Sequence, residues 1–273
     1  MISFNPQVMG VLNLTPDSFS DGGRFFHSEG IKVSSVVDAA AAMVAEGAHW
    51  LDIGGESTRP GAQPVSEQEE LDRVLPALEA LSGRFDTALS VDTSSPDLMK
   101  EAAKLGASMI NDVRALQREG ALEAVVDSNM AVCLMHMRGD PDSMQSKPSY
   151  ESVVEEVQAF LADALNRATA AGIAEERICL DPGFGFGKTL AHNMQLLQGI
   201  DRLTNLRRPI LVGFSRKSMI GKITGRDVDQ RDIGTTALNM LALKSGASIL
   251  RVHDVAAAID VVKIWQSFLE AQA

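Results

Sequence analysis

Eight short apolar runs recur along this chain of 273 residues, and each is followed by a loop and then by a segment with helical periodicity. The runs span residues 8–13, 50–54, 88–92, 108–111, 131–136, 178–181, 210–214 and 248–252. Their apolar character is continuous rather than alternating, as in a parallel sheet whose two faces are both covered. The repeated units predict an α/β protein, a single (β/α)8 TIM barrel in which residues 1–273 form one domain. A doubly wound open sheet is the alternative.

Glycine and serine mark the boundaries of the predicted helices. A glycine just after a helix can take the left-handed conformation that ends it. A serine just before a helix can cap its first backbone N–H groups, as Ser66 does when Glu69 completes a capping box. Ser95 before Pro96 suits a second helix start. Glycines stand between a helical segment and the next strand at Gly47, Gly106, Gly172 and Gly246.

Two loops are longer than a connection needs. One covers residues 15–30 after the first predicted strand, and the other covers residues 56–65 after the second. Barrels of this kind place their active sites at the carboxyl ends of the strands, and long loops in compact domains usually bind or cover ligands. We therefore expect both loops to border a site.

The net charge limits the kinds of molecule that the protein is expected to bind, and the cysteines indicate its compartment. The formal net charge of −11 disfavours binding to nucleic acid or to anionic membranes. No apolar run approaches the ~20 residues of a membrane-spanning helix, and no leader pattern precedes the first strand. Cys133 and Cys179 each lie inside an apolar run and resemble core residues of a reducing compartment. A cytoplasmic enzyme acting on small molecules is the expectation.

Polar side chains stand at or near the end of nearly every predicted strand. Any one of them alone fits a solvated loop residue or a carboxylate bonded to nearby backbone. In one barrel, the eight strands would instead gather them around the opening at the carboxyl ends of the strands, which we call the mouth. The cations Arg59, Lys217 and Arg251 would also lie there, in an otherwise acidic chain. The strand-end residues are Asn13, Asp52, Asp92, Asn111, Asp112, His136, Asp181, Ser215, Lys217, Arg251 and His253.

These side chains suggest a substrate with two chemically different halves. Carboxylates and amides such as Asp92 and Asn111 suit a flat heterocycle rich in N–H and carbonyl groups, because a carboxylate accepts parallel hydrogen bonds from an amidine-like edge. Arg251 and His253 suit phosphate or carboxylate, and Asn13 offers an oxygen for magnesium. The expected substrate is part heteroaromatic and part anionic.

The segment 181–189 is rich in glycine but matches neither common nucleotide-binding pattern. Pro182 occupies the place of the first glycine of a P-loop, and the glycine spacing departs from the dinucleotide fingerprint. We interpret the segment as a tight loop that brings backbone and Phe184 or Phe186 to a ligand, while a plain turn with two core phenylalanines is the alternative. The five histidines lack the spacing of a zinc site.

The strand-end motifs together resemble the dihydropteroate synthase family. The resemblance rests first on segments 13–23 and 52–61, which are similar to the two signature segments of that family. It continues in order along essentially the whole chain through segments 90–93, 110–113, 134–137, 181–188, 213–217 and 251–254. The resemblance implies transfer of a pterinylmethyl group from 6-hydroxymethyl-7,8-dihydropterin pyrophosphate to p-aminobenzoate, with Mg²⁺ as cofactor.

The resemblance also implies a role for individual residues. The pterin would be bound by Asp92, Asn111, Met135, Asp181 and Lys217, and the pyrophosphate by Asn13, Arg251 and His253. Magnesium would bind Asn13. The p-aminobenzoate would be bound by Phe19, Thr58, Arg59, Pro60, Phe186, Ser215 and Lys217. The catalytic residues would be Asp92, Asp181, Lys217 and Arg251.

Two further expectations follow from the resemblance. The protein would form a homodimer through barrel helices and would bind sulfonamides as mimics of p-aminobenzoate. A separate hypothesis is that Asp52 and Glu56 orient the second loop or Arg59 rather than contact substrate. A non-catalytic pterin-binding paralogue is an alternative function, although Asn13, Arg59 and Arg251 are all present. A methyltransferase that uses methyltetrahydrofolate is another, although it would not need Arg251 and His253.

Overall fold

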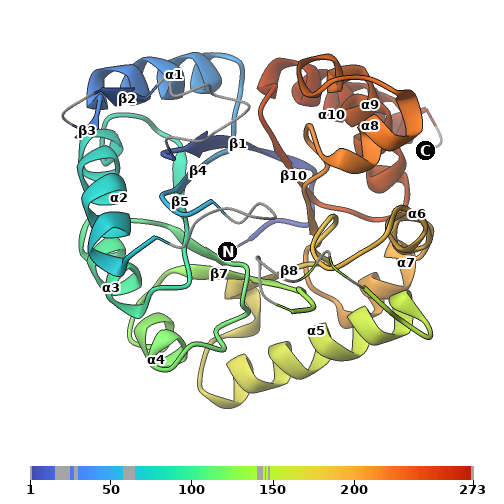
Figure 1. The fold of residues 1–273 in the computed structure, drawn as a ribbon, viewed down its shortest axis with the longest axis horizontal. Helices are drawn as coiled ribbons and strands as arrows, with labels where there is room; N and C mark the ends of the chain where they lie inside the picture. Colours follow the sequence, from blue (N-terminus) through green and yellow to red (C-terminus); the bar gives the residue numbers. More distant parts are fainter. Residues whose placement is uncertain are drawn as a thin grey trace.

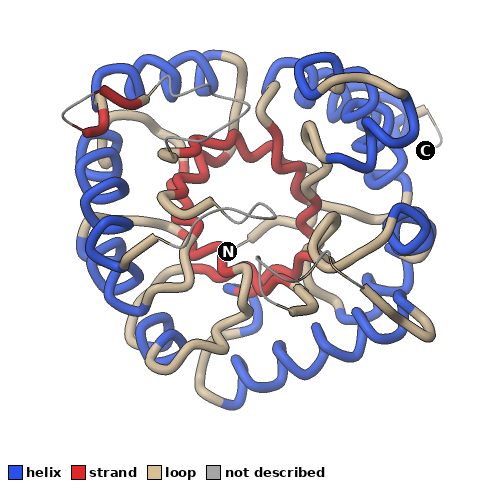
Figure 2. Tube along the Cα trace, in the orientation of Figure 1, coloured by secondary structure: helices blue, strands red, loops and turns tan. Residues whose placement is uncertain are grey.

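The structure is a computed structural model that describes residues 2–15, 25–27, 30–57, 65–139, 144, 146 and 148–271. Its main sheet is a ring of parallel strands, and helices surround the ring (Figures 1 and 2). The strands follow the order β8, β7, β6, β5, β4, β1, β10, β9. A parallel bridge between Leu180 and Ile210 joins the last strand to the first. The predicted TIM barrel is therefore confirmed, and the open-sheet alternative is wrong.

The barrel strands lie close to their predicted positions. Their bounds are β1 (Gln7–Asn13), β4 (Trp50–Gly54), β5 (Ala88–Asp92), β6 (Met109–Asp112), β7 (Ala131–Met135), β8 (Ile178–Asp181), β9 (Leu211–Val212) and β10 (Ile249–Val252). The prediction for β9 was too long, because only Leu211 and Val212 pair in register with β10. The two-residue strands β2 (Phe26–His27) and β3 (Gly30–Ile31) form an antiparallel hairpin within the first long loop, which was not predicted.

The outer layer consists of α-helices and short 3-10 turns. The α-helices are α1 (Val33–Ala45), α2 (Glu67–Leu81), α3 (Pro96–Lys104), α4 (Ala121–Val126), α5 (Val153–Ala170), α6 (Leu190–Gln198), α7 (Ile200–Leu203), α8 (Ser218–Thr224), α9 (Asp232–Lys244) and α10 (Val255–Glu270). The 3-10 turns are η1 (Glu175–Arg177), η2 (Thr204–Leu206) and η3 (Val228–Gln230). None of the described helices is both long and apolar enough to cross a membrane.

The predicted helix starts at Ser66 and Ser95 are confirmed. The Ser66 hydroxyl accepts a hydrogen bond from the backbone N–H of Glu69 at 3.2 Å, and the Ser95 hydroxyl accepts one from Leu98 at 3.5 Å. The capping box is only half formed, because the Glu69 carboxylate pairs with Arg73. The four glycines predicted to follow helices have positive φ, so a side chain at these positions would strain the backbone. Their φ angles are 101° at Gly47, 85° at Gly106, 106° at Gly172 and 103° at Gly246.

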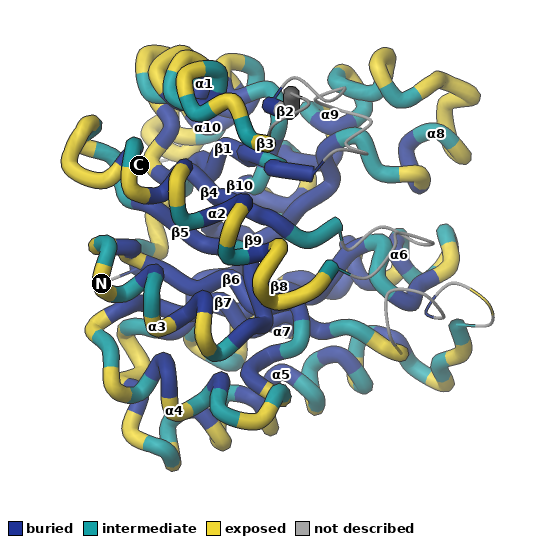
Figure 3. Tube along the Cα trace, turned by 60° about the vertical axis from the view of Figure 1, so that its left-hand side comes forward, coloured by how far each residue is buried: buried dark blue, intermediate teal, exposed yellow. Residues whose placement is uncertain are grey.

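The apolar core has two parts. The larger part lies between the strands and the helices. Figure 3 shows the barrel strands as buried segments, whereas the surrounding helices are partly exposed. The smaller part fills the amino-terminal end of the interior and consists of Ile2, Met9, Trp50, Met109, Ala131, Cys133, Cys179, Leu211 and Ile249. Both cysteines are free and fully buried, as predicted. The amino-terminal end of the barrel is therefore closed by side-chain packing.

Candidate active site

The predicted site residues that the structure describes all lie at the carboxyl-terminal end of the barrel. Each belongs to the last residues of a strand or to the loop that follows it, because parallel strands bring these ends to one edge of the ring. β1 carries Asn13, β5 carries Asp92, β6 carries Asn111, β7 carries Met135, β8 carries Asp181 and β10 carries Arg251, while Phe186, Ser215, Lys217 and His253 follow strands. Phe19, Thr58, Arg59 and Pro60 lie outside the described residues.

Arg251 connects two carboxylates across the barrel. Its Nε donates to Asp52 Oδ2 at 2.6 Å, and its NH2 nitrogen donates to Asp92 Oδ2 at 2.8 Å. Burial opposes the charge on Arg251, but the two carboxylates more than offset this effect and raise the pKa of the guanidinium. Burial also raises the pKa of Asp92 to about 8, although Arg251 works in the opposite direction. The guanidinium therefore remains charged, and Asp92 titrates near neutral pH.

Asn111 presents an acceptor to the barrel interior. Its Nδ2 donates to Asp52 Oδ2 at 3.2 Å, and its side chain is almost wholly buried. Its Oδ1 is buried, and no residue in the described part of the chain provides a hydrogen-bond partner for it. A buried polar atom without a partner costs free energy, and such atoms are rare unless a ligand or water satisfies them. This oxygen is therefore a candidate contact for a donor on a substrate.

Asp181 and Lys217 form the opposite side of the mouth. Asp181 Oδ1 accepts from the backbone N–H of Gly183 at 2.7 Å, and burial raises the pKa of this carboxyl while Lys217 lowers it. Lys217 Nζ donates to the carbonyl of Phe184 and lies 4.7 Å from the centroid of the Phe186 ring. Burial lowers the pKa of Lys217 to about 8, although Asp181 raises it. Lys217 can therefore change its charge near pH 8, beside a carboxyl whose pKa burial raises.

The two phenylalanines of the glycine-rich loop have different environments. Phe184 is fully buried and packs on Phe214, with ring centroids 4.4 Å apart. Phe186 is only partly buried and contacts Lys217. Phe184 is thus a core residue, as the alternative interpretation had it, whereas Phe186 has a face near the mouth.

Lys188 holds this loop in place, a role that the sequence analysis missed. Its Nζ lies 2.9 Å from His136 Nδ1 and donates to the carbonyls of Gly183 at 2.8 Å and Phe186 at 3.0 Å. Burial lowers the pKa of Lys188 well below its ordinary value, and burial together with Lys188 lowers the pKa of His136 to about 3. A Cβ on Gly183 would lie 1.9 Å from the carbonyl oxygen of His136, so only glycine fits there. The sequence feature that could have indicated this role is the position of Lys188 at the end of a glycine-rich loop.

His253, Ser215 and Asn13 form a third group. His253 Nδ1 lies 2.8 Å from Ser215 Oγ, which also accepts from the backbone N–H of His253 at 3.1 Å. His253 Nε2 lies 3.5 Å from Asn13 Nδ2. The structure therefore brings together the two residues predicted for pyrophosphate from β1 and from the loop after β10. It also places Ser215, predicted for p-aminobenzoate, against His253.

A strained turn after β6 ties neighbouring loops together. Ala115 and Leu116 have φ angles of 50° and 56°, which cost free energy in residues other than glycine. Asp112 stabilises the turn, because its carboxylate accepts from the backbone N–H groups of Arg114 at 2.9 Å and Leu116 at 2.7 Å. Arg114 in turn pairs with Glu56 at 3.3 Å. Glu56 thus joins the start of the second long loop to the turn after β6. The hydrogen-bond partners of Asp52, in contrast, lie on barrel strands.

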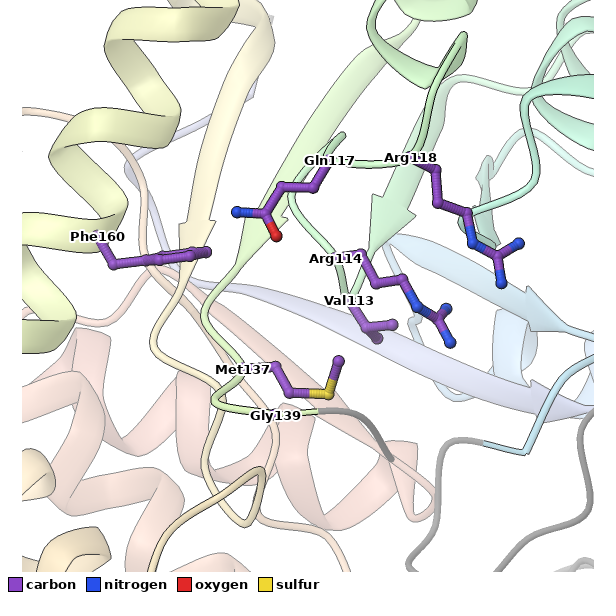
Figure 4. Close-up of a pocket in the computed structure, with 7 residues that line it drawn as sticks. All are labelled: Val113, Arg114, Gln117, Arg118, Met137, Gly139 and Phe160. Carbon is purple, nitrogen blue, oxygen red and sulfur yellow. The ribbon is translucent and has the colours of Figure 1, made fainter. Parts of the chain in front are cut away.

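A separate hollow of about 360 Å³ opens beside this turn (Figure 4). It lies between the segments that follow β6 and β7 and the helix α5, and the guanidinium groups of Arg114 and Arg118 are on one side of it (Figure 4). The lining residues are Val113, Arg114, Gln117, Arg118, Met137, Gly139 and Phe160. Among the described residues, none that is predicted to bind substrate belongs to this group.

Comparison with known proteins identifies close relatives over nearly the whole chain. A family model described as pterin binding enzyme matches residues 9–253. The dihydropteroate synthase of Haemophilus influenzae is 51% identical over 266 residues, which cover 97% of this chain and 95% of that protein. The structure resembles a crystal structure of Yersinia pestis dihydropteroate synthase with a sulfonamide drug, with a TM-score of 0.94 and 48% identity over 98% of this chain and 96% of that one. It also resembles a structure of Xanthomonas albilineans dihydropteroate synthase with 4-aminobenzoic acid, with a TM-score of 0.89 and 48% identity over 97% of this chain and 93% of that one.

Proposed function

Because the chain belongs to the dihydropteroate synthase family, we propose that it condenses 6-hydroxymethyl-7,8-dihydropterin pyrophosphate with p-aminobenzoate to give 7,8-dihydropteroate and pyrophosphate. The reaction is a step of folate biosynthesis. The main support for the proposal is Oδ1 of Asn111, which is buried and has no hydrogen-bond partner among the described residues. Asn111 lies among residues that match the family motifs. It supplies an acceptor for a pterin N–H at the place where the family resemblance expects the ring.

The pterin would lie within the mouth against Asp92, Asn111, Met135, Asp181 and Lys217. Three of these side chains carry oxygen atoms suited to the donors of a pterin edge. Met135 is buried and lies beside Asp181 in the sheet register, so it supplies an apolar neighbour for the ring. The arrangement agrees with a site that is mostly enclosed and has a few converging polar groups.

The pyrophosphate would bind Arg251, His253 and Asn13. Only one hydrogen on Nε and one on NH2 of Arg251 are used by the carboxylates, so other N–H groups of the guanidinium can donate to phosphate oxygens. The contact between Asn13 and His253 places both on one side of the mouth. Arg251 would therefore join the pterin half of the site to its anionic half.

The p-aminobenzoate would bind near Phe186, Ser215 and Lys217. The Phe186 ring beside the Lys217 ammonium offers an apolar face next to a positive charge, which suits an aromatic ring that carries a carboxylate. Phe19, Thr58, Arg59 and Pro60 complete this part of the proposal from the two long loops. The Xanthomonas albilineans relative is described with 4-aminobenzoic acid.

The chemistry follows from these groups. The carbon–oxygen bond between the pterin methylene and pyrophosphate breaks, and its electron pair leaves with the pyrophosphate. The resulting cation is delocalised over the pterin, where the carboxylates of Asp92 and Asp181 stabilise it, while Arg251 stabilises the departing anion. The neutral amine of p-aminobenzoate then attacks the methylene carbon and loses a proton, so no strong general base is needed. The enzyme would therefore accelerate the reaction mainly by positioning the two substrates and by stabilising the charges that develop.

Magnesium fits this arrangement as an ion shared with the substrate. Among the described residues no group of three or more His, Cys, Asp or Glu could hold a metal ion. Mg²⁺ commonly takes only one or two protein oxygens and fills its other positions with phosphate and water. Asn13 would supply the protein oxygen. When bound, the ion would neutralise charge that develops on the pyrophosphate.

The proposal includes a homodimer and a single-domain chain. Among the described residues, large exposed apolar side chains concentrate on α8, α9 and α10, which pack consecutively. They are Ile223, Ile233, Leu241, Ile264, Phe268 and Leu269. Exposed apolar side chains gathered on neighbouring helices support self-association. The free, buried cysteines support a cytoplasmic location.

The dimer is tested by measuring mass in solution. Ile233→Glu places a charge on the exposed face of α9 and should convert the dimer to a monomer in analytical ultracentrifugation. Phe4→Glu changes another exposed apolar residue, which precedes β1 and belongs to none of these helices, and should leave the dimer intact. A monomeric parent protein would contradict the proposal.

The reaction is tested by pyrophosphate release from purified protein given the dihydropterin pyrophosphate, p-aminobenzoate and magnesium. Release should require p-aminobenzoate, should be inhibited by a sulfonamide, and should be lost in Arg251→Ala. Tight pterin binding without turnover would instead identify a non-catalytic pterin-binding protein. Circular dichroism of the variant would check that it is folded.

A further inference from the structure

Asp52 is a charged residue that solvent does not reach. It lies on β4 between the core residues Leu51 and Ile53, and its exposed fraction is 0%. A carboxylate in such a place costs several kcal/mol of hydration unless other groups compensate it. Because its atoms do not reach the open part of the mouth, the carboxylate can affect a substrate only through its neighbours.

The neighbours of Asp52 come from three other strands. Ser90 Oγ of β5 donates to its Oδ1 at 2.6 Å, while Asn111 Nδ2 of β6 and Arg251 Nε of β10 both donate to its Oδ2, at 3.2 Å and 2.6 Å. All three partners are donors, as an acceptor-only group requires. Two of them are the residues proposed above for the pterin and for the pyrophosphate.

The acceptor-only character of a carboxylate fixes how Asn111 is oriented. The amide must turn its NH2 group toward Asp52, and this leaves Oδ1 as the buried atom without a partner. With the amide reversed, two oxygens would face each other at the site of the present hydrogen bond, and the substrate would meet an NH2 group. The hydrogen bond to Asp52 therefore leaves the Asn111 carbonyl oxygen, an acceptor, facing the substrate.

The same carboxylate fixes the direction of the Arg251 guanidinium. The bond from Nε to Asp52 and the bond from NH2 to Asp92 hold two corners of a planar group. A guanidinium held at two corners has little rotational freedom, so its remaining N–H groups point in a defined direction. The negative charge of Asp52 also helps to keep Arg251 charged in a buried place.

We propose that Asp52 is a positioning residue for both halves of the substrate. It orients Asn111 so that the carbonyl oxygen meets a pterin N–H, and it aims Arg251 at the departing pyrophosphate. This inference rests on the proposed function for the identity of the ligands. It differs from the expectation that Asp52 acts on the second loop, because its contacts lie inside the barrel.

The test compares Asp52→Asn with Ser90→Ala. Both variants disturb the same buried hydrogen-bond cluster, but only the first alters the contacts to Asn111 and Arg251. Isothermal titration measures binding of inorganic pyrophosphate with magnesium and of the dihydropterin pyrophosphate, and steady-state kinetics measures kcat and both KM values. Thermal unfolding shows how far each variant is destabilised.

Asp52→Asn should weaken binding of both pterin and pyrophosphate by roughly 10- to 100-fold, the range of a lost charge-assisted hydrogen bond. The KM for p-aminobenzoate should change less than about threefold, and Ser90→Ala should leave every ligand constant within about threefold. Equal losses in the two variants, or unchanged pterin and pyrophosphate binding in Asp52→Asn, would overturn the proposal.

A double variant separates the effect of Asp52 on Asn111 from its effect on Arg251. It also provides the test if Asp52→Asn alone does not fold. Asp52→Asn with Asn111→Asp exchanges the donor and the acceptor, so an oxygen at position 111 again faces the substrate. It should recover pterin binding to within about tenfold of the parent while pyrophosphate binding stays weak, since one charge-assisted contact to Arg251 is lost. Equal weakening of both ligands contradicts the proposal.

The outcomes also separate this inference from the proposed function. If the parent protein binds both ligands but releases no pyrophosphate with p-aminobenzoate, the proposed reaction fails. The binding comparison among the variants remains valid in that case, because it needs no turnover.

Discussion

The two ends of the barrel interior differ sharply although they belong to the same strands. Successive residues of a strand alternate in direction, so residues two apart point the same way and lie about 7 Å apart along the strand. In four strands the residue nearer the amino end belongs to the apolar interior cluster and the one two positions later to the polar mouth. These pairs are Trp50 and Asp52, Met109 and Asn111, Cys179 and Asp181, and Ile249 and Arg251.

The difference separates what stabilises the barrel from what binds its substrate. The apolar end gains free energy from burial and close packing. The mouth holds Asp52, Asp92 and Asp181 with few cations, and burial raises the pKa of the latter two carboxyls. Such an arrangement costs stability, and it is typical of sites where charge is needed for a reaction. Substitutions at the two ends should therefore have opposite effects on activity and stability.

The largest effect is expected for Asp92→Asn. The substitution removes a carboxylate that would stabilise the cationic pterin, so kcat/KM should fall about 100- to 1,000-fold. Because Asp52 still pairs with Arg251 and a neutral amide replaces a desolvated carboxyl, the midpoint of thermal unfolding should change little. Steady-state kinetics and differential scanning calorimetry measure the two quantities. A large loss of stability would show that the mouth is also a structural centre.

The opposite result is expected for Met109→Ala at the amino-terminal end of the same sheet. Met109 is fully buried, and its truncation should lower the free energy of unfolding by about 2–5 kcal/mol. At temperatures where the variant is folded, kcat should match the parent within about threefold. Urea denaturation followed by tryptophan fluorescence gives the stability. A kcat loss as large as that of Asp92→Asn would break the distinction between the two ends.

The pH dependence of pterin binding should report the charges of the mouth. Asp92 has a pKa raised to about 8, so below this pH a ligand that needs its carboxylate must release a proton. Affinity should increase up to tenfold per pH unit toward pH 8 and stop increasing as Lys217, whose pKa is lowered to about 8, loses its proton. Titration calorimetry at several pH values measures this slope. Asp92→Asn should abolish it, and a slope that persists in the variant would assign it to another group.

The same shift has a defined effect on stability. Since the folded pKa of Asp92 lies above its ordinary value of 3.8, the folded protein keeps a proton that the unfolded chain loses between about pH 4 and pH 8. The contribution of Asp92 to the free energy of unfolding must therefore decrease as pH rises through this window. Comparing urea denaturation of the parent and Asp92→Asn across the window isolates that contribution.

The smallest effect is expected for Cys179→Ala. Cys179 is buried and free in the apolar interior cluster, so loss of its sulfur should cost only about 1 kcal/mol of stability. Turnover should be unchanged, and the parent protein should show the same activity with and without reductant. Loss of activity in the variant would indicate that the apolar end affects the mouth after all.

The strands and helix ends were predictable because their signals are local. Continuous apolar runs located β4, β5 and β8 to the residue, and the glycines after helices have the positive φ that ends a helix. The shortness of β9 could not be predicted, because only its pairing with β10 limits it. The β2–β3 hairpin was missed because two-residue strands have no apolar periodicity.

The site was predictable as a set of strand ends but not as a set of contacts. Strand ends place Asp92, Asn111 and Arg251 at one mouth, which the structure bears out. That Asp52 accepts from residues 38, 59 and 199 positions away depends on how the ring closes. The pairing of Lys188 with His136 likewise joins two loops, and no local pattern in the sequence encodes it.

A crystal structure of the protein with dihydropterin pyrophosphate bound, in the absence of p-aminobenzoate, tests the proposed site most directly. We expect a pterin N–H within hydrogen-bonding distance of Asn111 Oδ1, the ring edge against Asp92 and Asp181, and phosphate oxygens on Arg251. A pterin bound instead in the hollow lined by Arg114, Arg118 and Phe160, with the mouth left to water, would contradict it.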